Sequence, residues 1–453
     1  MVTKIRVKSK LLIVFLLFCG IVNGQNNESS YEERMEWFKD AKLGVFIHWG
    51  YYGVNGIGES WSMYHKKISY EDYMMQGKQF TAEHYKPKEW ARLFKKIGAR
   101  YAILTTKHHD GVALWDTKLS KLNVIEKTPA KRDLVAPFVE ALRQENLKVG
   151  LYYSLCDWSH PDYNVVFPRP NTQKNYPQKG QKELSEWQRF VRFYKGQIKE
   201  LNDDFYPDLY WFDGDWEKSS EQWRAQSLKD SLLAWNPKTI VNSRLKTHGD
   251  YSTPEQGIPV VRPKGPWEFC MTMNDNWGYY PSDTNYKPIS QIIRTFVEVI
   301  ASGGNLLLNI GPKPDGTIAP EQMERLEALG DWIKKHERAV FETKAGLPYG
   351  HFYGPTLLNK DETKIYLCLF DAPKNYISLK GIQNKVKSIR VVGSNQELSF
   401  VRNGGAAWNN IPGILRIEIP ESRYLDDNVT VLEIELEDAL KLYRGHGNAV
   451  ELN

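Results

Sequence analysis

Cysteine is scarce in this chain, since its 453 residues include only four. Cys19 lies in the N-terminal segment, and Cys156, Cys270 and Cys368 are far apart in the sequence. Three widely spaced cysteines provide neither a disulfide framework nor the ligand spacing of a metal site. We therefore expect buried thiols in a globular protein large enough to fold without cross-links.

Long apolar runs are also missing, and no segment reaches the roughly 20 apolar residues that a bilayer-spanning helix needs. The N-terminus has the pattern of an export signal, because a basic stretch at residues 4–10 precedes an apolar run at 11–18. We expect residues 1–24 to be a signal peptide, which makes the protein exported, either periplasmic or secreted. Lipidation at Cys19 is the less favoured alternative, because Phe18 before it is too bulky for a lipoprotein signal.

A strong charge of one sign is absent as well. The formal net charge of +5 is spread along the chain, and no nucleic-acid-binding pattern stands out, so we expect no nucleic-acid partner. No glycine-rich phosphate loop follows any expected strand, which disfavours a nucleotide-binding fold. Aromatic residues, in contrast, are plentiful, with 15 Trp and 25 Tyr. A chain rich in these side chains is suited to binding sugar rings.

Apolar, strand-like runs alternate with amphipathic helical segments from about residue 31 to residue 343. Continuous apolar strands separated by helices predict a parallel sheet. Roughly 310 residues of this alternation favour an α/β fold of the closed (β/α)8 barrel type, which we assign to residues 25–343. The expected strands lie at residues 43–48, 101–105, 148–154, 208–213, 239–243 and 305–310, and the expected helices at residues 88–97, 133–145, 184–201, 290–302 and 320–341.

The pattern changes after about residue 344. Short alternating runs broken by Gly, Asn and Pro predict a small antiparallel β-sandwich over residues 344–438, which we interpret as a packing partner for the barrel. Residues 439–453 show no clear pattern and are expected to form a tail. The expected strands of the sandwich lie at residues 364–370, 376–379, 386–391, 398–401, 415–419 and 429–436.

A single carboxylate, Asp213, ends the apolar run in the sequence Tyr-Trp-Phe-Asp-Gly at residues 210–214. The carboxyl ends of parallel strands are where barrels of this type perform chemistry. The structural alternative is an aspartate that caps the next helix or holds a turn. This motif alone does not decide between the two.

Other polar and aromatic residues follow the remaining expected strands, and a barrel gathers its strand ends at one face. Two carboxylates, with His, Arg and Tyr groups that bind hydroxyls and with Trp walls, are typical of a glycosidase. Each residue alone has a structural explanation, but together they favour a site. The candidates are His48, Glu59, Trp61, His108, His109, Tyr152, Trp211, Asp213, Arg244, Glu255 and Glu268.

Four motifs carry a resemblance to the α-L-fucosidases of glycoside hydrolase family 29. They are Gly-Val-Phe-Ile-His-Trp-Gly at 44–50, Lys-His-His-Asp-Gly at 107–111, Trp-Phe-Asp-Gly at 211–214 and Gly-Asn-Leu-Leu-Leu-Asn-Ile-Gly-Pro at 304–312. They occur in the family's order across the expected barrel. The resemblance implies a retaining exo-hydrolase that removes terminal α-L-fucose from a glycan through a covalent fucosyl-enzyme, without a metal or other cofactor.

The resemblance also implies roles for individual residues. Asp213 matches the nucleophile, and Trp61 matches an aromatic wall. Glu59 is close to a sugar-binding carboxylate of the family, but it precedes Trp61 by two positions rather than one. The residues that match the fucose-binding pocket are His48, His108, His109, Tyr152, Trp211 and Arg244.

Two residues compete for the role of general acid/base, whose position varies within the family. Glu255 follows Asp213 by about 40 residues in a Thr-Pro-Glu context similar to that of some members, whereas Glu268 lies in a more recognisable Pro-Trp-Glu motif. We favour Glu255, because a loop after a strand can bring an acid to the leaving oxygen. Glu268 stays the alternative.

Two other classes of protein are weighed. A metal-dependent hydrolase would use His48, His108, His109 and Asp110, but adjacent residues of a strand point to opposite faces, so both adjacent histidines reach one metal only through a bend. A carbohydrate-binding protein on a degenerate barrel would not need carboxylates on both sides of a bond. Nothing in the sequence indicates an oligomeric state.

Overall fold

A computed structural model describes residues 31–163 and 181–445. The expected signal peptide, its alternative at Cys19 and the last eight residues of the expected tail lie outside the described residues. Among the helices of the described part, none has the length and apolar character needed to cross a membrane.

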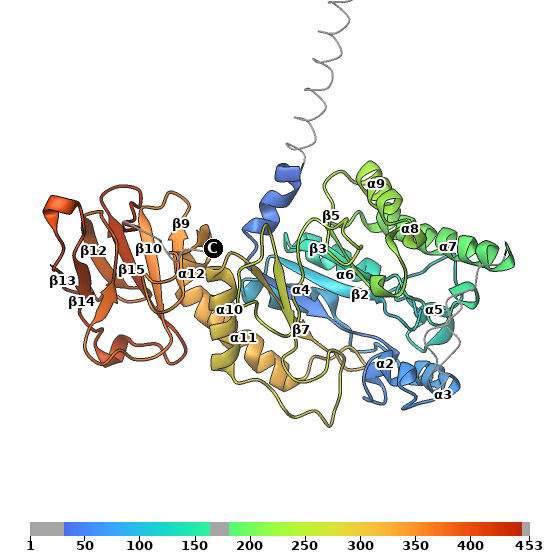
Figure 1. The fold of residues 1–453 in the computed structure, drawn as a ribbon. Helices are drawn as coiled ribbons and strands as arrows, with labels where there is room; N and C mark the ends of the chain where they lie inside the picture. The colour runs from blue at the N-terminus through green and yellow to red at the C-terminus, as the bar shows by residue number, and fades with distance from the viewer. Residues whose placement is uncertain (1–30, 164–180, 446–453) are drawn as a thin grey trace, which may run out of the picture.

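The centre of the molecule is a curled, entirely parallel sheet of seven strands, in the order β5-β4-β3-β2-β1-β7-β6 (Figure 1). Nearly every residue of these strands is buried, as expected when helices cover a parallel sheet. All six strands expected in this region are present, and β6 was not among them. The strands are β1 (Leu43–Ile47), β2 (Tyr101–Lys107), β3 (Lys148–Ser154), β4 (Leu209–Asp213), β5 (Ile240–Val241), β6 (Glu268–Met271) and β7 (Asn305–Ile310).

Residues 251–256 occupy the gap between the edge strands β5 and β6. They form isolated parallel bridges, Asn242 with Tyr251 on one side and Glu255 with Cys270 on the other. The Cys270 N–H donates to the Pro254 carbonyl at 3.1 Å. Pro254 itself has no N–H to donate, which explains why this segment is not a regular strand. The barrel therefore has seven regular strands and an irregular segment in the eighth position.

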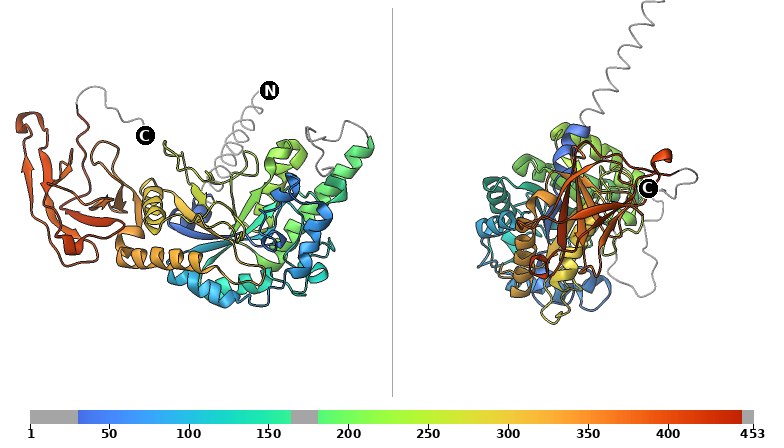
Figure 2. Two further views of the ribbon diagram at one scale, coloured as in Figure 1. Left: turned by 90° about the horizontal axis from the view of Figure 1, so that it is seen from below. Right: turned by 90° about the vertical axis from the view of Figure 1, so that its left-hand side faces the viewer.

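Helices surround the outer face of the sheet, as the two views of Figure 2 show. In α4, Trp90 and Phe94 lie on the buried face, and Pro87 starts the helix where its missing N–H costs nothing. The expected helix at 320–341 is divided into α11 and α12. The helices are α2 (Trp61–Tyr64), α3 (Tyr70–Met75), α4 (Pro87–Lys96), α5 (Val124–Lys127), α6 (Val135–Gln144), α7 (Gln181–Phe205), α8 (Ser220–Trp223), α9 (Ala225–Trp235), α10 (Ile289–Ala301), α11 (Pro320–Lys335) and α12 (Glu337–Val340).

Two antiparallel sheets follow, of five strands in the order β12-β15-β10-β9-β8 and of three in the order β11-β14-β13. They enclose a separate apolar core, so the expected sandwich is present. Residues 439–445, expected in the tail, continue along it, because Leu442 bridges Ile382. The strands are β8 (Thr343–Ala345), β9 (Thr356–Asn359), β10 (Lys364–Leu369), β11 (Ile377–Leu379), β12 (Val386–Val391), β13 (Phe400–Asn403), β14 (Ile414–Ile417) and β15 (Thr430–Leu436).

The sandwich lies against α10 and α11 of the barrel (Figure 1). The Trp332 indole on α11 donates to the carbonyl of Val429 at 3.0 Å. Val429 and Val431 belong to the buried apolar cluster of the barrel rather than to that of the sandwich. The two parts therefore share apolar core.

Candidate active site

The turn after β4 presents Asp213 at the carboxyl end of the sheet. Gly214, the next residue, has a φ of +79°, and a Cβ built there would lie 2.6 Å from the Cys156 Sγ. Only glycine fits both this left-handed conformation and this close approach. The expected strand–Asp–Gly arrangement is thus present, with the carboxylate at the catalytic face of the barrel.

A cavity of about 190 Å³ opens at this face. It is smaller than the roughly 300–1,000 Å³ typical of pockets for drug-sized ligands, and its size suits a single sugar ring. Nine of the candidate residues line it, whereas Tyr152 and Glu268 do not. The lining consists of Phe46, His48, Glu59, Trp61, His108, His109, Trp211, Asp213, Trp216, Arg244, Glu255 and Trp277.

Asp213 is buried and surrounded by hydrogen-bond donors. The Tyr152 hydroxyl donates to its Oδ2 at 2.9 Å, and Arg244 Nη1 donates to its Oδ1 at 2.9 Å. His109 Nε2 also lies near Oδ2, at 3.8 Å, which is too far for a hydrogen bond. Charge-assisted bonds of this kind stabilise a carboxylate. Tyr152 therefore does not line the cavity, but its hydroxyl binds the Asp213 carboxylate that does.

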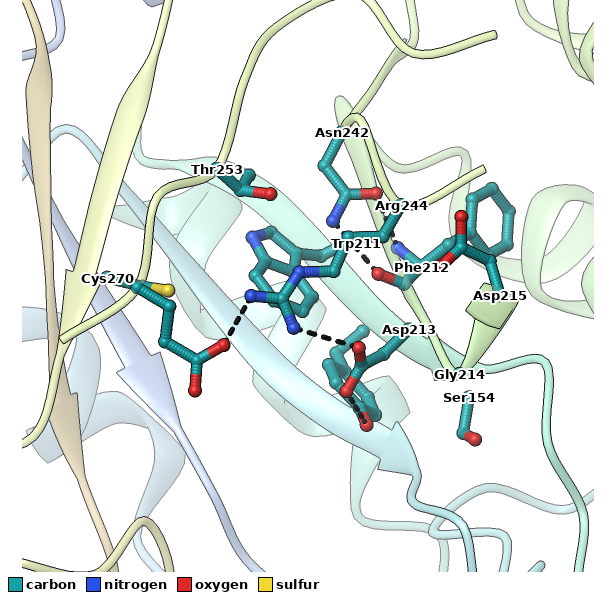
Figure 3. A network of polar contacts seen from close by, with 12 residues as sticks. Ser154, Trp211, Phe212, Asp213, Gly214, Asp215, Asn242, Arg244, Thr253 and Cys270 are labelled. Atoms are coloured by element: carbon teal, nitrogen blue, oxygen red, sulfur yellow. Dashed lines mark hydrogen bonds and ion pairs between the residues drawn. The ribbon is translucent and has the colours of Figure 1, made fainter. Parts of the chain in front are cut away.

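Arg244 connects the two candidate catalytic carboxylates. Its Nη1 binds Asp213, while its Nη2 donates to the carboxylate of Glu255 and forms an ion pair with it. The guanidinium lies over the Trp211 indole, 4.5 Å from the ring centroid. Figure 3 shows Arg244 stacked on Trp211 and reaching Asp213. One planar cation is thus shared by both carboxylates.

The hydrogen bonds of His48 fix its tautomer. Its Nδ1 lies 2.6 Å from Asn309 Oδ1, an atom that only accepts, so Nδ1 carries the proton. The amide of Asn309 donates in turn to the Trp277 carbonyl at 2.7 Å. Burial lowers the pKa of His48 to about 4, so the ring is neutral at ordinary pH. Its Nε2 is then a hydrogen-bond acceptor.

The adjacent histidines are also held through Nδ1. His109 Nδ1 lies 2.6 Å from Ser154 Oγ, and because that hydroxyl donates to the Cys156 carbonyl, His109 is the donor to it. His108 Nδ1 lies 2.6 Å from Ser60 Oγ. Burial lowers the pKa of His108 well below its usual value. Serine partners therefore orient both rings.

Glu59 reaches the cavity in spite of its unusual spacing to Trp61. Its Oε1 accepts from the Gly278 N–H at 2.7 Å. The Trp61 ring is nearly parallel to Trp216, with centroids 6.2 Å apart, and it meets His109 edge-on at 5.4 Å. Trp216 is 43% exposed. The two indoles form an aromatic side of the cavity.

The two competing glutamates occupy different environments. Glu255 lines the cavity, and its side chain is 36% exposed. Glu268, on β6, is completely buried and accepts hydrogen bonds from the Tyr101 hydroxyl at 2.6 Å and from Trp211 Nε1 at 2.8 Å. Burial raises the pKa of Glu268 to about 7. Of these two glutamates, Glu255 is therefore the one that can contact a ligand in the cavity.

Three lining residues were missed in the sequence. Phe46 lies on β1 two positions before His48, which directly follows the strand, so period-2 alternation could have indicated it. Trp216 lies two positions beyond the Trp-Phe-Asp-Gly motif at 211–214. Trp277 lies in an irregular segment after β6, and no sequence pattern indicates its position.

The residues considered for a metal are not arranged as ligands. Asp110 does not line the cavity, and its carboxylate accepts from the Tyr73 hydroxyl and the Val112 N–H. Within residues 31–163 and 181–445, no group of three or more His, Cys, Asp or Glu side chains is placed to hold a metal ion.

Comparisons with known proteins show which family the chain belongs to. Residues 23–338 match the family model described as alpha-L-fucosidase. The tissue alpha-L-fucosidase of Mus musculus is 31% identical over 442 residues, which cover 90% of this chain and 91% of that protein. The corresponding protein of Homo sapiens is 35% identical over 340 residues, covering 68% of this chain and 69% of its own.

Solved structures give the same result. The alpha-L-fucosidase isoenzyme 1 from Paenibacillus thiaminolyticus superposes with a TM-score of 0.81 at 32% identity, covering 90% of this chain and all of that one. A trapped covalent intermediate of a GH29 alpha-L-fucosidase from Bacteroides thetaiotaomicron superposes with a TM-score of 0.78 at 26% identity, covering 89% and 96% of the two chains. The chain belongs to the α-L-fucosidases of glycoside hydrolase family 29.

Proposed function

We propose that this α-L-fucosidase is exo-acting and retaining, that it removes terminal α-L-fucose from a glycan through a covalent fucosyl-enzyme, and that it is exported. The observation that carries the mechanism is the pair Asp213 and Glu255, which line a cavity of single-sugar size and share one arginine. A cavity of this size favours a terminal sugar. The basic and apolar N-terminal sequence supports export.

The shared arginine supports the retaining route. Retaining glycosidases hold their two carboxyl groups about 5–5.5 Å apart, whereas inverting ones hold them about 6.5–9.5 Å apart to admit a water. The two terminal nitrogens of the Arg244 guanidinium each bind one of the carboxylates, so both carboxyl groups lie within hydrogen-bond reach of one cation, as a closely spaced pair does. The trapped covalent intermediate of the Bacteroides thetaiotaomicron relative supports the same route.

In the first step Asp213 attacks the anomeric carbon while Glu255 protonates the departing oxygen. In the second step Glu255 deprotonates the water that releases fucose. Glu255 must hold a proton when the glycosidic bond breaks, and in that state its other oxygen can still accept from Arg244. Arg244 and Tyr152 stay on Asp213 and keep its charge available for attack.

The remaining lining residues bind the sugar. The neutral His48 offers Nε2 as an acceptor for a fucose hydroxyl, and the Glu59 carboxylate offers a second acceptor. His108 and His109 are held by serines so that their rings stay in place. The Trp61 ring provides an apolar wall for the sugar, and Trp211 lines the same cavity.

The test is release of 4-nitrophenol from its α-L-fucoside, with wild type and the variants Asp213→Ala, Glu255→Ala and Glu268→Ala, each with and without azide. Asp213→Ala should lose about a thousandfold or more in kcat/KM, as removal of a nucleophile does elsewhere. Azide should rescue Glu255→Ala, because a small anion replaces the base-activated water, and should not rescue Glu268→Ala.

Asp215→Asn is the matched control, because Asp215 binds the Lys246 N–H in the same turn and does not line the cavity. Its activity should equal that of wild type. Detection of the product anomer by NMR should show α-L-fucose first. Normal activity of Asp213→Ala, or β-L-fucose as the first product, would overturn the retaining mechanism.

A further inference from the structure

Glu268 is a buried carboxylate whose two partners are both neutral. It is inaccessible to solvent and accepts from the Tyr101 hydroxyl and the Trp211 indole N–H. A carboxylate is buried at a large cost unless its oxygens are hydrogen-bonded. Because Glu268 does not line the cavity, contact with the substrate does not explain it. Its partner Trp211, in contrast, does line the cavity.

Trp211 contacts both Glu268 and the cavity residue Arg244. Its indole is stacked on the Tyr152 ring, with centroids 5.6 Å apart and an angle of 19° between planes. The guanidinium of Arg244 lies over the same indole at 4.5 Å. An indole held at Nε1 cannot rotate in its plane, so it presents a fixed surface to that cation.

Arg244 in turn binds both Asp213 and Glu255. A free arginine side chain has many rotamers, and holding one of them costs conformational entropy. A fixed aromatic surface reduces that cost by preorganising the guanidinium. The chain of contacts therefore runs from Glu268 through Trp211 and Arg244 to the two carboxylates.

We propose that Glu268 is a positioning residue: it fixes the Trp211 indole and through it places Arg244 between the two catalytic carboxylates. This inference rests on the proposed roles of Asp213 and Glu255. It separates Glu268 from the acid/base role, because Glu268 acts through its ability to accept a hydrogen bond and transfers no proton to the substrate.

Two substitutions separate these roles. In Glu268→Gln the amide oxygen can still accept from the Trp211 N–H, so kcat/KM should stay within about threefold of wild type. In Glu268→Leu that N–H is buried without an acceptor, and kcat/KM should fall about tenfold or more. An acid/base residue would show a large loss with both substitutions, together with rescue by azide.

A double-mutant cycle tests the route through Trp211. In a Trp211→Phe background, which lacks the indole N–H, Glu268→Leu should lower kcat/KM by no more than about threefold, because the contact is already absent. Tyr101→Phe is the matched control, since it removes the other bond to the same carboxylate and does not touch the cavity. Its kcat/KM should match that of wild type.

The outcomes are distinct. Equal losses from Glu268→Leu in the wild-type and Trp211→Phe backgrounds would overturn the proposal, as would unchanged activity in Glu268→Leu. If Glu268→Leu does not fold, Glu268→Gln serves as the test. A large loss of kcat/KM in that variant contradicts the proposal, most clearly if azide rescues it, and near-normal kcat/KM supports the proposal. No fucoside hydrolysis by wild type would instead contradict the proposed function.

Discussion

At the scale of single residues, the carboxyl group of Glu268 is held where ionisation is unfavourable. Burial raises its pKa from the ordinary 4.5 to about 7. A carboxyl group with a raised pKa in the folded state contributes stability that is complete below about pH 4.5 and is lost as the pH rises through about 7. Its charge should therefore destabilise the fold in mildly alkaline solution.

We expect Glu268→Gln to remove this pH dependence. The free energy of unfolding of the variant, relative to wild type, should rise by about 1–3 kcal/mol between pH 4.5 and pH 8, because only the wild type ionises there. Urea denaturation of both proteins at the two pH values measures it. A difference that does not change with pH would contradict the raised pKa.

The sequence predicted which residues gather at the site, but it did not predict how deeply each one is buried or which residues it contacts. Asp213, Arg244 and the histidines follow strands, so the barrel brings them together. The burial of Glu268, in contrast, depends on Tyr101 and Trp211, which are 167 and 57 residues away along the chain. Closure of the sheet brings these three residues together, so no pattern within a short stretch of sequence predicts their contacts.

At the scale of elements, the turn after β4 depends on Gly214. Its positive φ and the nearby Cys156 Sγ leave no space for a side chain. We expect Gly214→Ala to lower the free energy of unfolding by about 1–3 kcal/mol. Its kcat/KM should fall about tenfold, because displacement of the adjacent Asp213 disturbs the reacting geometry.

Gly257→Ala is the control for that substitution, since a Cβ at Gly257 meets no atom within 4 Å. Urea denaturation and fucoside hydrolysis of the two variants give the comparison. Similar values for both would show that the turn tolerates a side chain.

The long elements were predictable from their apolar patterns, whereas strand β6 was not. The helices α4, α6 and α10 have clear apolar faces, and the predictions for them are confirmed within a few residues. Strand β6 has only four residues and begins with a charged one, Glu268. Its assignment depends on pairing with β7, which the sequence does not reveal.

At the scale of the whole molecule, the barrel and the sandwich should unfold together because they share apolar core. We expect Trp332→Ala to lower the free energy of unfolding by about 3–5 kcal/mol, since the buried indole contacts the sandwich at Val429. Its kcat/KM at 25 °C should be unchanged, because Trp332 does not line the cavity.

Trp408→Ala is the matched control, because Trp408 is 88% exposed on the sandwich. Its effect should stay within about 0.5 kcal/mol. Urea denaturation followed by circular dichroism and by activity should give one coincident transition for each protein. A transition in circular dichroism at lower urea than the loss of activity would show that the two parts unfold independently.

The irregular segment at residues 251–256 has a consequence for how such an enzyme can diversify. Among the residues that the structure describes, the proposed acid, Glu255, lies at a position of the barrel wall that no regular strand occupies. Insertions in loops cost little free energy, about 0.6 kcal/mol for each doubling of length. The loop after Glu255 can therefore change in length and alter which leaving groups are accommodated, while the strand that carries the nucleophile stays intact. A change of length in this loop therefore leaves the parallel strands of the barrel as they are.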